Sequence, residues 1–253
     1  TYNINSLNFS SPFEIINKDK KDNFKLIVFN PAVPAGDSLL FDYDMLVENR
    51  GFTALGGNSR ILTNGTFIDS HMYPGFGYDE GNEISDRKKR NELELPLLAG
   101  MPEMNDSTAL MNNYVNSDAD WIHYEAVVST SSDQIGITSG DLVKEWKEGD
   151  RNYYHYKTDQ KVLNFFAFIS AKYEVKKDKW NDIPVEVYYQ KGHEYNVDYM
   201  IKAMKMSLDY CSKNFSHYQF NQLRIFEFPR FSSFVQAFPG MIPFSEGFGF
   251  IAK

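Results

Sequence analysis

The sequence predicts a mainly β protein whose C-terminal part combines helix and strand. Up to about Tyr189 it contains many short segments that alternate apolar and polar residues, with almost no helical periodicity. After Asn196 a long helical pattern is followed by two apolar strands. We therefore expect an antiparallel, β-sandwich-like domain over residues 1–191 and a second part over residues 192–253.

Composition agrees with this fold class and limits the partners. The 253 residues include 21 Phe and 16 Tyr, side chains that strands favour. The formal net charge of -8 has the wrong sign for a phosphate-binding surface, so we expect no nucleic-acid partner. The single cysteine, Cys211, excludes an internal disulfide and a cysteine-rich zinc site. No apolar run of about 18 residues occurs, so the sequence predicts no membrane-spanning helix within these residues.

The first strands are expected in the N-terminal quarter of the chain. Residues 24–29 form an apolar run, and residues 39–47 alternate apolar and polar side chains. Residues 60–63 and 66–69 flank Asn64-Gly65. That dipeptide between two strands predicts a type I′ hairpin.

A charged helix and a polar connection are expected next. Ser85 is placed to cap a short helix that contains residues 86–90, whose basic side chains we expect on a solvated face. Residues 96–118 contain two prolines and many asparagines. Such a composition predicts an irregular surface connection.

Strand patterns resume after this connection. A hairpin is expected to turn at residues 148–150, and His155 is expected to pack at a strand edge. The strands are predicted over residues 121–128, 142–146, 153–156, 163–169 and 185–189.

The long helical pattern begins after Asn196, which occupies the position of an N-cap, with Asp198 in the first turn. Apolar residues recur every three or four positions, which indicates one buried face, and we expect Cys211 to pack in the core with the others. The residues of this face are Val197, Ile201, Met204, Leu208, Cys211 and Phe215.

The last segment contains an unexpected acid. Residues 223–228 predict a buried strand, and after an aromatic loop residues 242–251 predict a second apolar strand that includes Glu246. A carboxylate in such a strand is costly to bury unless a cation pairs with it. Two interpretations remain: a strand glutamate that faces solvent or pairs with an arginine, or a carboxylate that binds an ammonium group in a dry cleft.

No metal-binding motif is complete in this sequence. His193-Glu194 resembles the start of a His-Glu-x-x-His zinc motif, but Val197 stands where the second histidine is required. The other histidines have no spacing that chelates a metal within one element, so we predict no metal site in this chain. They are His71, His123, His155 and His217.

Several short sequence blocks along the chain are similar to those of one protein family. They lie at residues 120–121, 128–135, 163–168, 185–196, 207–210, 214–215, 218, 223–229 and 242–246. Together they resemble the aminopeptidase N family of gluzincin zinc metallopeptidases. The likeness is closest to the bacterial branch in which the peptidase-like region is fused behind an ABC-transporter permease, and it covers nearly the whole chain from about residue 40.

The resemblance implies a fold and a binding role. In the family a β-sheet domain precedes a thermolysin-like catalytic domain, which agrees with a boundary near residue 192. The family's Gly-x-Met-Glu-Asn motif lies on an edge strand and binds the free α-amino group of a peptide. By order and spacing it falls on residues 245–251, which implies substrate-binding roles for Ser245, Glu246 and Gly247. Ser245 replaces the motif's Met and Gly247 its Asn, so exopeptidase specificity does not follow from the motif.

The resemblance also implies what this chain lacks. The family's zinc motif follows the segment that contains Glu246, and the sequence stops at Lys253. We therefore expect zinc in a full-length parent but no cofactor, catalytic residue or activity in this fragment. The transporter-fused branch implies a membrane-embedded parent with this part on the extracytoplasmic, periplasmic face. The alternative is a non-catalytic β-sandwich module that binds peptide or protein in a transporter assembly, and a His-Glu-x-x-His beyond Lys253 discriminates the two.

Overall fold

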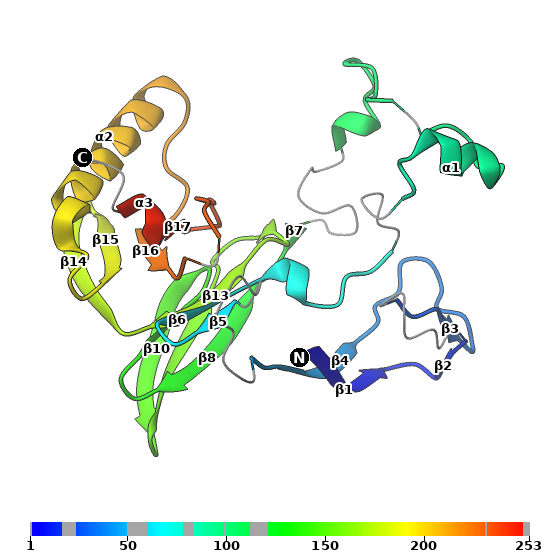
Figure 1. Cartoon of the computed structure of the whole chain (residues 1–253), viewed down its shortest axis with the longest axis horizontal. Helices are drawn as coiled ribbons and strands as arrows, with labels where there is room; N and C mark the ends of the chain where they lie inside the picture. The colour runs from blue at the N-terminus through cyan, green and yellow to red at the C-terminus, as the bar shows by residue number, and fades with distance from the viewer. Residues whose placement is uncertain are drawn as a thin grey trace. The chain divides into compact units, whose positions relative to one another are not determined.

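The computed structural model divides into two compact units, Thr1–Leu55 and Gly56–Lys253. Strands predominate among the described residues, and their longest helix lies in the C-terminal part (Figure 1). This confirms the predicted fold class, mainly β with an α+β C-terminal part. The boundary predicted near residue 192 stays a prediction. The structure describes residues 2–16, 24–49, 60–77, 83–98, 100–111, 121–230 and 232–249.

The first unit contains two small antiparallel sheets. The ring of Phe9 stacks on Phe41 with 4.6 Å between centroids and meets Phe29 edge-on at 5.1 Å, so it packs against both sheets. Two of its strands were not predicted, because Asn and Ser interrupt the apolar alternation of the first and the second is only three residues long. The pairs are β1 (Tyr2–Phe9) with β4 (Phe41–Val47), and β2 (Phe13–Ile15) with β3 (Ile27–Phe29).

The first half of the second unit is antiparallel. One sheet has the order β5 (Ile61–Leu62), β6 (Gly65–Asp69), β13 (Ala167–Ala171), β9 (Ile135–Ile137). Another has the order β10 (Asp141–Glu148), β11 (Arg151–Lys157), β8 (Glu125–Ser131), and β12 (Val162–Leu163) pairs with β7 (Trp121–Ile122). Short helices lie between β6 and β7: η1 (Ser70–Met72), α1 (Arg87–Glu92) and η3 (Ala109–Met111). Another, η4 (Glu194–Asn196), comes after all of these strands.

The last sheet contains the parallel strands of the fold. Strand β14 pairs antiparallel with β15, whereas β15, β16 and β17 pair parallel in that order. Parallel neighbours need a crossover connection, and helix α2 supplies it between β15 and β16. The elements are β14 (Tyr173–Trp180), β15 (Ile183–Gln190), α2 (Val197–Asn214), β16 (Leu223–Phe228) and β17 (Met241–Ser245).

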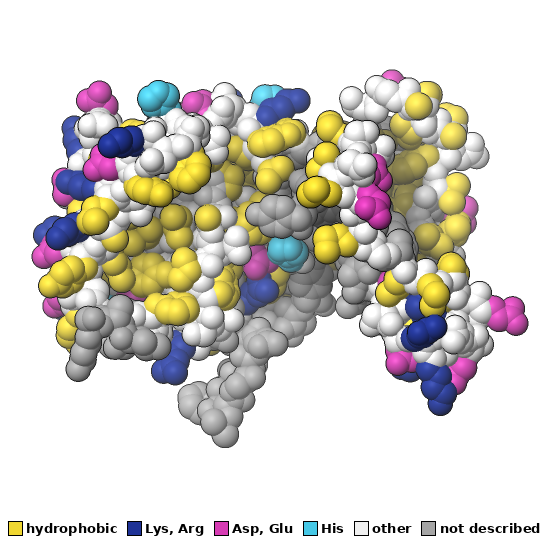
Figure 2. Space-filling view, turned by 90° about the horizontal axis from the view of Figure 1, so that it is seen from above, with side chains coloured by type: hydrophobic (Ala, Val, Ile, Leu, Met, Phe, Trp, Pro, Cys, Tyr) yellow, Lys and Arg dark blue, Asp and Glu magenta, His cyan; other side chains and the backbone are white. Residues whose placement is uncertain are grey.

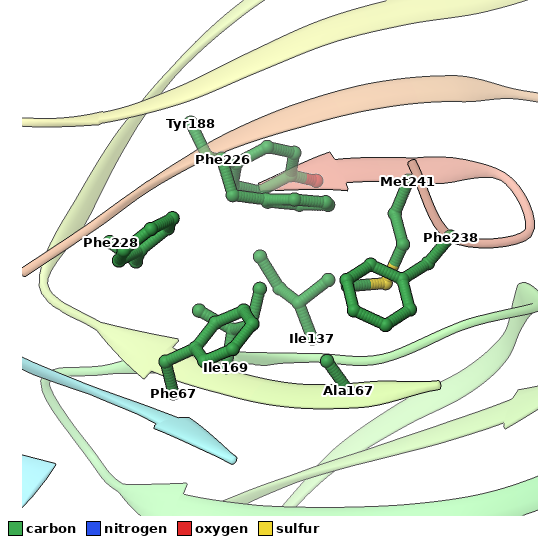
Figure 3. Close-up of a cluster of buried hydrophobic side chains, with 9 residues drawn as sticks. All are labelled: Phe67, Ile137, Ala167, Ile169, Tyr188, Phe226, Phe228, Phe238 and Met241. Atoms are coloured by element: carbon green, nitrogen blue, oxygen red, sulfur yellow. The ribbon is translucent and has the colours of Figure 1, made fainter. Parts of the chain in front are cut away.

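Both faces of this sheet are covered, so its strands are apolar on both sides. On one face Val187 and Ile225 pack against Ile201 and Met204 of α2. On the other face, rings of β15 and β16 meet side chains of β6, β9 and β13 (Figure 3). That second cluster comprises Phe67, Ile137, Ala167, Ile169, Tyr188, Phe226, Phe228, Phe238 and Met241.

Several local predictions are confirmed. Strand β16 coincides with the predicted residues 223–228, and the β10–β11 hairpin turns at Gly149-Asp150, with Gly149 at a φ of 59°. The described part of the 96–118 connection is irregular and mostly exposed apart from η3, and residues 112–118 lie outside the described residues.

Other local predictions are wrong. Helix α1 is capped by Asp86, which accepts a hydrogen bond from the Lys89 amide, and not by Ser85. Arg90 is buried, because its guanidinium donates to Glu83 and to the carbonyls of Ile84 and Pro96.

The predicted buried face of α2 is too long. Its first members pack on the sheet, but Cys211 is exposed and Phe215 is 78% exposed. The last turn of the helix lies beyond the residues that contact the sheet, so no core surrounds these two side chains. Asn196 occupies the N-cap position, but its side chain makes no capping hydrogen bond.

We expect Phe226→Ala to lower the free energy of unfolding by about 3 to 5 kcal/mol, because the ring is fully buried and its loss leaves a cavity. Phe215→Ala makes the same chemical change at an exposed position and should cost less than about 0.5 kcal/mol. Urea denaturation followed by circular dichroism measures both. Similar losses in the two variants would contradict this description of the core.

Candidate functional site

Three neighbouring parallel strands end at the same edge of the last sheet, and each is followed or ended by a polar residue. Glu227 is the penultimate residue of β16, Glu246 directly follows β17, and His193 lies three residues after β15. One ligand atom from each of the three lies within 4.8 Å of the other two. In sheets of parallel strands, ligands bind at the carboxyl ends. The cluster His193–Glu227–Glu246 is therefore the candidate functional site.

Glu227 is buried within a network of hydrogen bonds. Glu227 is only 1% exposed to solvent. One carboxylate oxygen lies 2.5 Å from Nδ1 of His193, and the other accepts from the backbone amide of Gln190 at 2.7 Å. Burial raises the pKa of this carboxyl above its ordinary value, the bonds from Gln190 and His193 oppose that shift, and the nearby charge of Glu246 adds to it.

Glu246 is bound by two segments that are distant in sequence. Oε1 accepts from the backbone amide of Arg230 at 2.7 Å, and Oε2 accepts from Nδ2 of Asn64 at 3.1 Å. The carbonyl of Asn64 in turn accepts from Nε2 of Gln190 at 3.0 Å. The turn between β5 and β6 is thus connected to the ends of β15 and β17.

The Asn64-Gly65 dipeptide has a different role from the predicted one. The hairpin is confirmed, but its two-residue loop is Thr63-Asn64, because Leu62 pairs with Gly65. Neither loop residue has a positive φ, so the type I′ assignment is wrong. Gly65 is needed because a Cβ there would lie 3.1 Å from the carbonyl oxygen of Ser170 and 3.2 Å from Pro229. This close approach brings Asn64 to Glu246.

The edge geometry differs from the one that the family motif implies. Glu246 is not inside a strand but begins α3 (Glu246–Gly249). Strand β17 is last in its sheet, yet the amide of Ser245 donates to Phe234 and the carbonyl of Pro243 accepts from Gln236. The outer edge of β17 is therefore covered by its own preceding loop, and a peptide cannot pair with it directly.

Ser245 and Gly247 hold the turn that presents Glu246. Ser245 is fully buried, its hydroxyl donates to the carbonyl of Ser232 at 2.7 Å, and it accepts from the Gly247 amide at 3.3 Å. Their substrate-binding roles stay predictions. The observed contacts give both residues a positioning role.

The charge of the cluster favours a small cation. With both carboxylates ionised, the cluster carries a net negative charge whichever form the single imidazole takes. Within the described residues, no lysine or arginine side chain lies within 4.0 Å of either carboxylate. An ammonium group supplies one positive charge and three donors, and charge-assisted hydrogen bonds to carboxylates are strong.

Zinc does not fit the same residues as they lie. Catalytic zinc sites commonly combine two histidines with one carboxylate, whereas this cluster has one histidine and two carboxylates. The histidine also turns Nδ1 to Glu227, and each carboxylate oxygen already accepts a hydrogen bond. As they lie, the described residues form a hydrogen-bonded anionic site.

Sequence reasoning found Glu246 but missed its neighbours. Glu227 lies in the apolar strand 223–228. An acid among apolar residues is the same pattern that singled out Glu246, so the sequence could also have indicated Glu227. His193 was considered only as part of a zinc motif. Asn64 carried no signal for this role, because its contact with Glu246 spans 182 positions of sequence.

Comparisons with known proteins support the fold. No family model matches the sequence, and no curated protein matches it either. Among solved structures, the chain is similar to the crystal structure of Legionella pneumophila aminopeptidase A in complex with aspartic acid, with a TM-score of 0.62 and 12% identity. The match covers 96% of this chain and 25% of that chain. This chain therefore shares its fold with about a quarter of an aminopeptidase.

Two surface features complete the description. Among the described helices, none combines the length and the hydropathy needed to cross a bilayer. On the face that Figure 2 shows, the coloured Lys and Arg side chains are interspersed with Asp and Glu. The expectation of no nucleic-acid partner stays a prediction.

The raised pKa of Glu227 predicts how stability depends on pH. The native state favours the protonated carboxyl, so this stabilisation is complete below the ordinary pKa of 4.5 and is lost as pH rises through the higher native value. As pH rises above the ordinary value of 4.5, the free energy of unfolding of the wild type should fall relative to that of Glu227→Gln until the carboxyl is ionised in both states. Urea denaturation across that range measures the difference, with Glu148→Gln as the exposed control. A constant difference, or one of opposite slope, contradicts the prediction.

Proposed function

We propose that Glu246, next to Glu227, binds the α-ammonium group of a peptide. The observation that carries the proposal is the pair of adjacent carboxylates with one imidazole and, among the described residues, no lysine or arginine side chain within 4.0 Å. Glu246 is partly exposed and contacts the ammonium, whereas Glu227 is buried and adds negative potential. The acid of the apolar C-terminal segment is then a ligand-binding group and not only a structural one.

The wider function follows from the fold. We infer that this chain is the N-terminal portion of a zinc aminopeptidase-like protein that removes N-terminal residues from peptides, and that the fragment itself is inactive. The similarity in fold to an aminopeptidase supports this inference, as do the sequence blocks that resemble the aminopeptidase N family. In this proposal zinc belongs to the rest of the parent protein, and the described residues contribute the ammonium site.

The membrane setting is a finer part of the proposal. The blocks at residues 128–135 and 163–168 resemble the branch fused to ABC-transporter permeases. We therefore propose a membrane-associated parent with this part on the extracytoplasmic face. A non-catalytic peptide-binding module of a transporter assembly uses the same ammonium site and differs in having no turnover.

The binding test compares a free and a blocked N-terminus. We expect alanyl-leucinamide to bind this chain and its N-acetyl form to bind much more weakly, by isothermal titration calorimetry. Glu246→Gln should weaken binding of the free form about ten- to hundredfold, since it removes one charge-assisted contact of about 1.5 to 3 kcal/mol.

Glu148→Gln provides the matched control, because it makes the same change at an exposed residue of β10. It should leave binding unchanged. Equal losses for free and acetylated peptide in Glu246→Gln would show that Glu246 does not recognise the amino group. In a longer polypeptide that turns over, the same variant should raise KM chiefly for substrates with a free N-terminus.

A further inference from the structure

A second site lies in a groove at the other end of β17. The groove has a volume of about 590 Å³, within the range of pockets that bind small ligands. Its walls come from η1, from β7 and β12, from the loop before β16, and from the loop that ends at Pro239. All of these segments belong to the second unit.

One wall of the groove is aromatic and firmly packed. Phe165 stacks on Phe238 with 4.2 Å between ring centroids and 18° between the planes, and Phe238 is part of the core cluster. Trp121 and Phe220 also line the groove, and Trp121 is 61% exposed. Because these wall rings are already packed, an aromatic ring of a ligand can stack on them with little further loss of side-chain conformational entropy.

Three glutamines line the groove beside these rings. Gln160 donates from Nε2 to the carbonyl of Gln219 at 3.1 Å and so joins two of the walls. Gln236 is exposed, and its side chain donates only a long 3.4 Å bond to the neighbouring Ala237 carbonyl. Side-chain amides that donate and accept match the hydrogen-bonding groups of a peptide backbone.

The charge of the groove is opposite to that of the cluster at Glu246. Lys161 lines the groove, and within the described residues no carboxylate lies within 4.0 Å of its ammonium nitrogen. No Asp or Glu is among the described lining residues. Asp159 lies two residues before Lys161, but it does not line the groove, and its carboxylate accepts from Asn221 at 3.2 Å. An anionic group of a ligand could therefore pair with the Lys161 ammonium beside the aromatic wall.

We propose that this groove binds the C-terminal end of a peptide whose last residue is aromatic. The carboxylate pairs with Lys161, the last side chain packs against the rings of Phe165 and Phe220, and the preceding amide is bound by glutamine side chains. The proposal uses none of the residues of the ammonium site, so it is independent of the proposed function.

The test uses N-acetylated peptides, which lack the ammonium that the Glu246 site recognises. We expect N-acetyl-glycyl-phenylalanine to shift backbone amide resonances of groove residues in a saturable way in two-dimensional NMR spectra. Its C-terminal amide and N-acetyl-glycyl-alanine should each bind about tenfold more weakly. Equal binding of acid and amide, or shifts confined to other residues, overturns the proposal.

Variants locate the carboxylate and the ring. Lys161→Gln should abolish the preference for acid over amide, whereas Lys147→Gln, on an exposed position of β10, should retain it. Phe220→Ala should reduce the preference for phenylalanine over alanine and leave the preference for acid. Retention of both preferences in both groove variants overturns the proposal, and it leaves the test of Glu246 unaffected.

Discussion

The parallel pairing of β15, β16 and β17 is the constraint on which the candidate site depends. Parallel neighbours place their carboxyl ends at one edge, so residues that are far apart in sequence meet there. The crossover is stable because Ile201 and Met204 of α2 pack on the covered face. Burial of Glu227 is tolerated since its oxygens are bonded to His193 and the Gln190 amide. Loss of either partner would leave one oxygen of this buried carboxylate without a hydrogen bond, which is costly.

The sequence predicts elements that depend on local patterns. It does not predict burial and contacts that depend on segments distant in sequence. Strand β16 and the start of α2 follow from apolar patterns that one element carries alone. The burial of α2 beyond Leu208 depends on where the sheet ends, which periodicity does not reveal, so Cys211 was misplaced. Asn64-Gly65 illustrates the same limit. Its hairpin is local, but its contacts to Pro229 and Glu246 come from the tertiary fold.

The two sites are proposed to recognise opposite ends of a peptide. Glu246 follows β17 and is anionic, whereas the wall at Pro239 precedes β17 and the groove contains Lys161. The five residues of β17 lie between these positions and span roughly 17 Å. In the two proposals, the ammonium site lies at the C-terminal end of β17, and the groove at its N-terminal end is completed by η1, β7, β12 and the loop before β16. Peptide binding is the proposed function, and both sites are consistent with it.

The most direct measurement follows the two carboxyl groups themselves. In protein labelled with ¹³C at glutamate side chains, titration with alaninamide should shift the carboxyl resonances of Glu227 and Glu246 together and to saturation, while N-acetyl-alaninamide leaves them unchanged. That result would show that the cluster binds an ammonium group. If neither resonance responds, or if both ligands shift them equally, the cluster is a structural hydrogen-bond network and the account of the site is wrong.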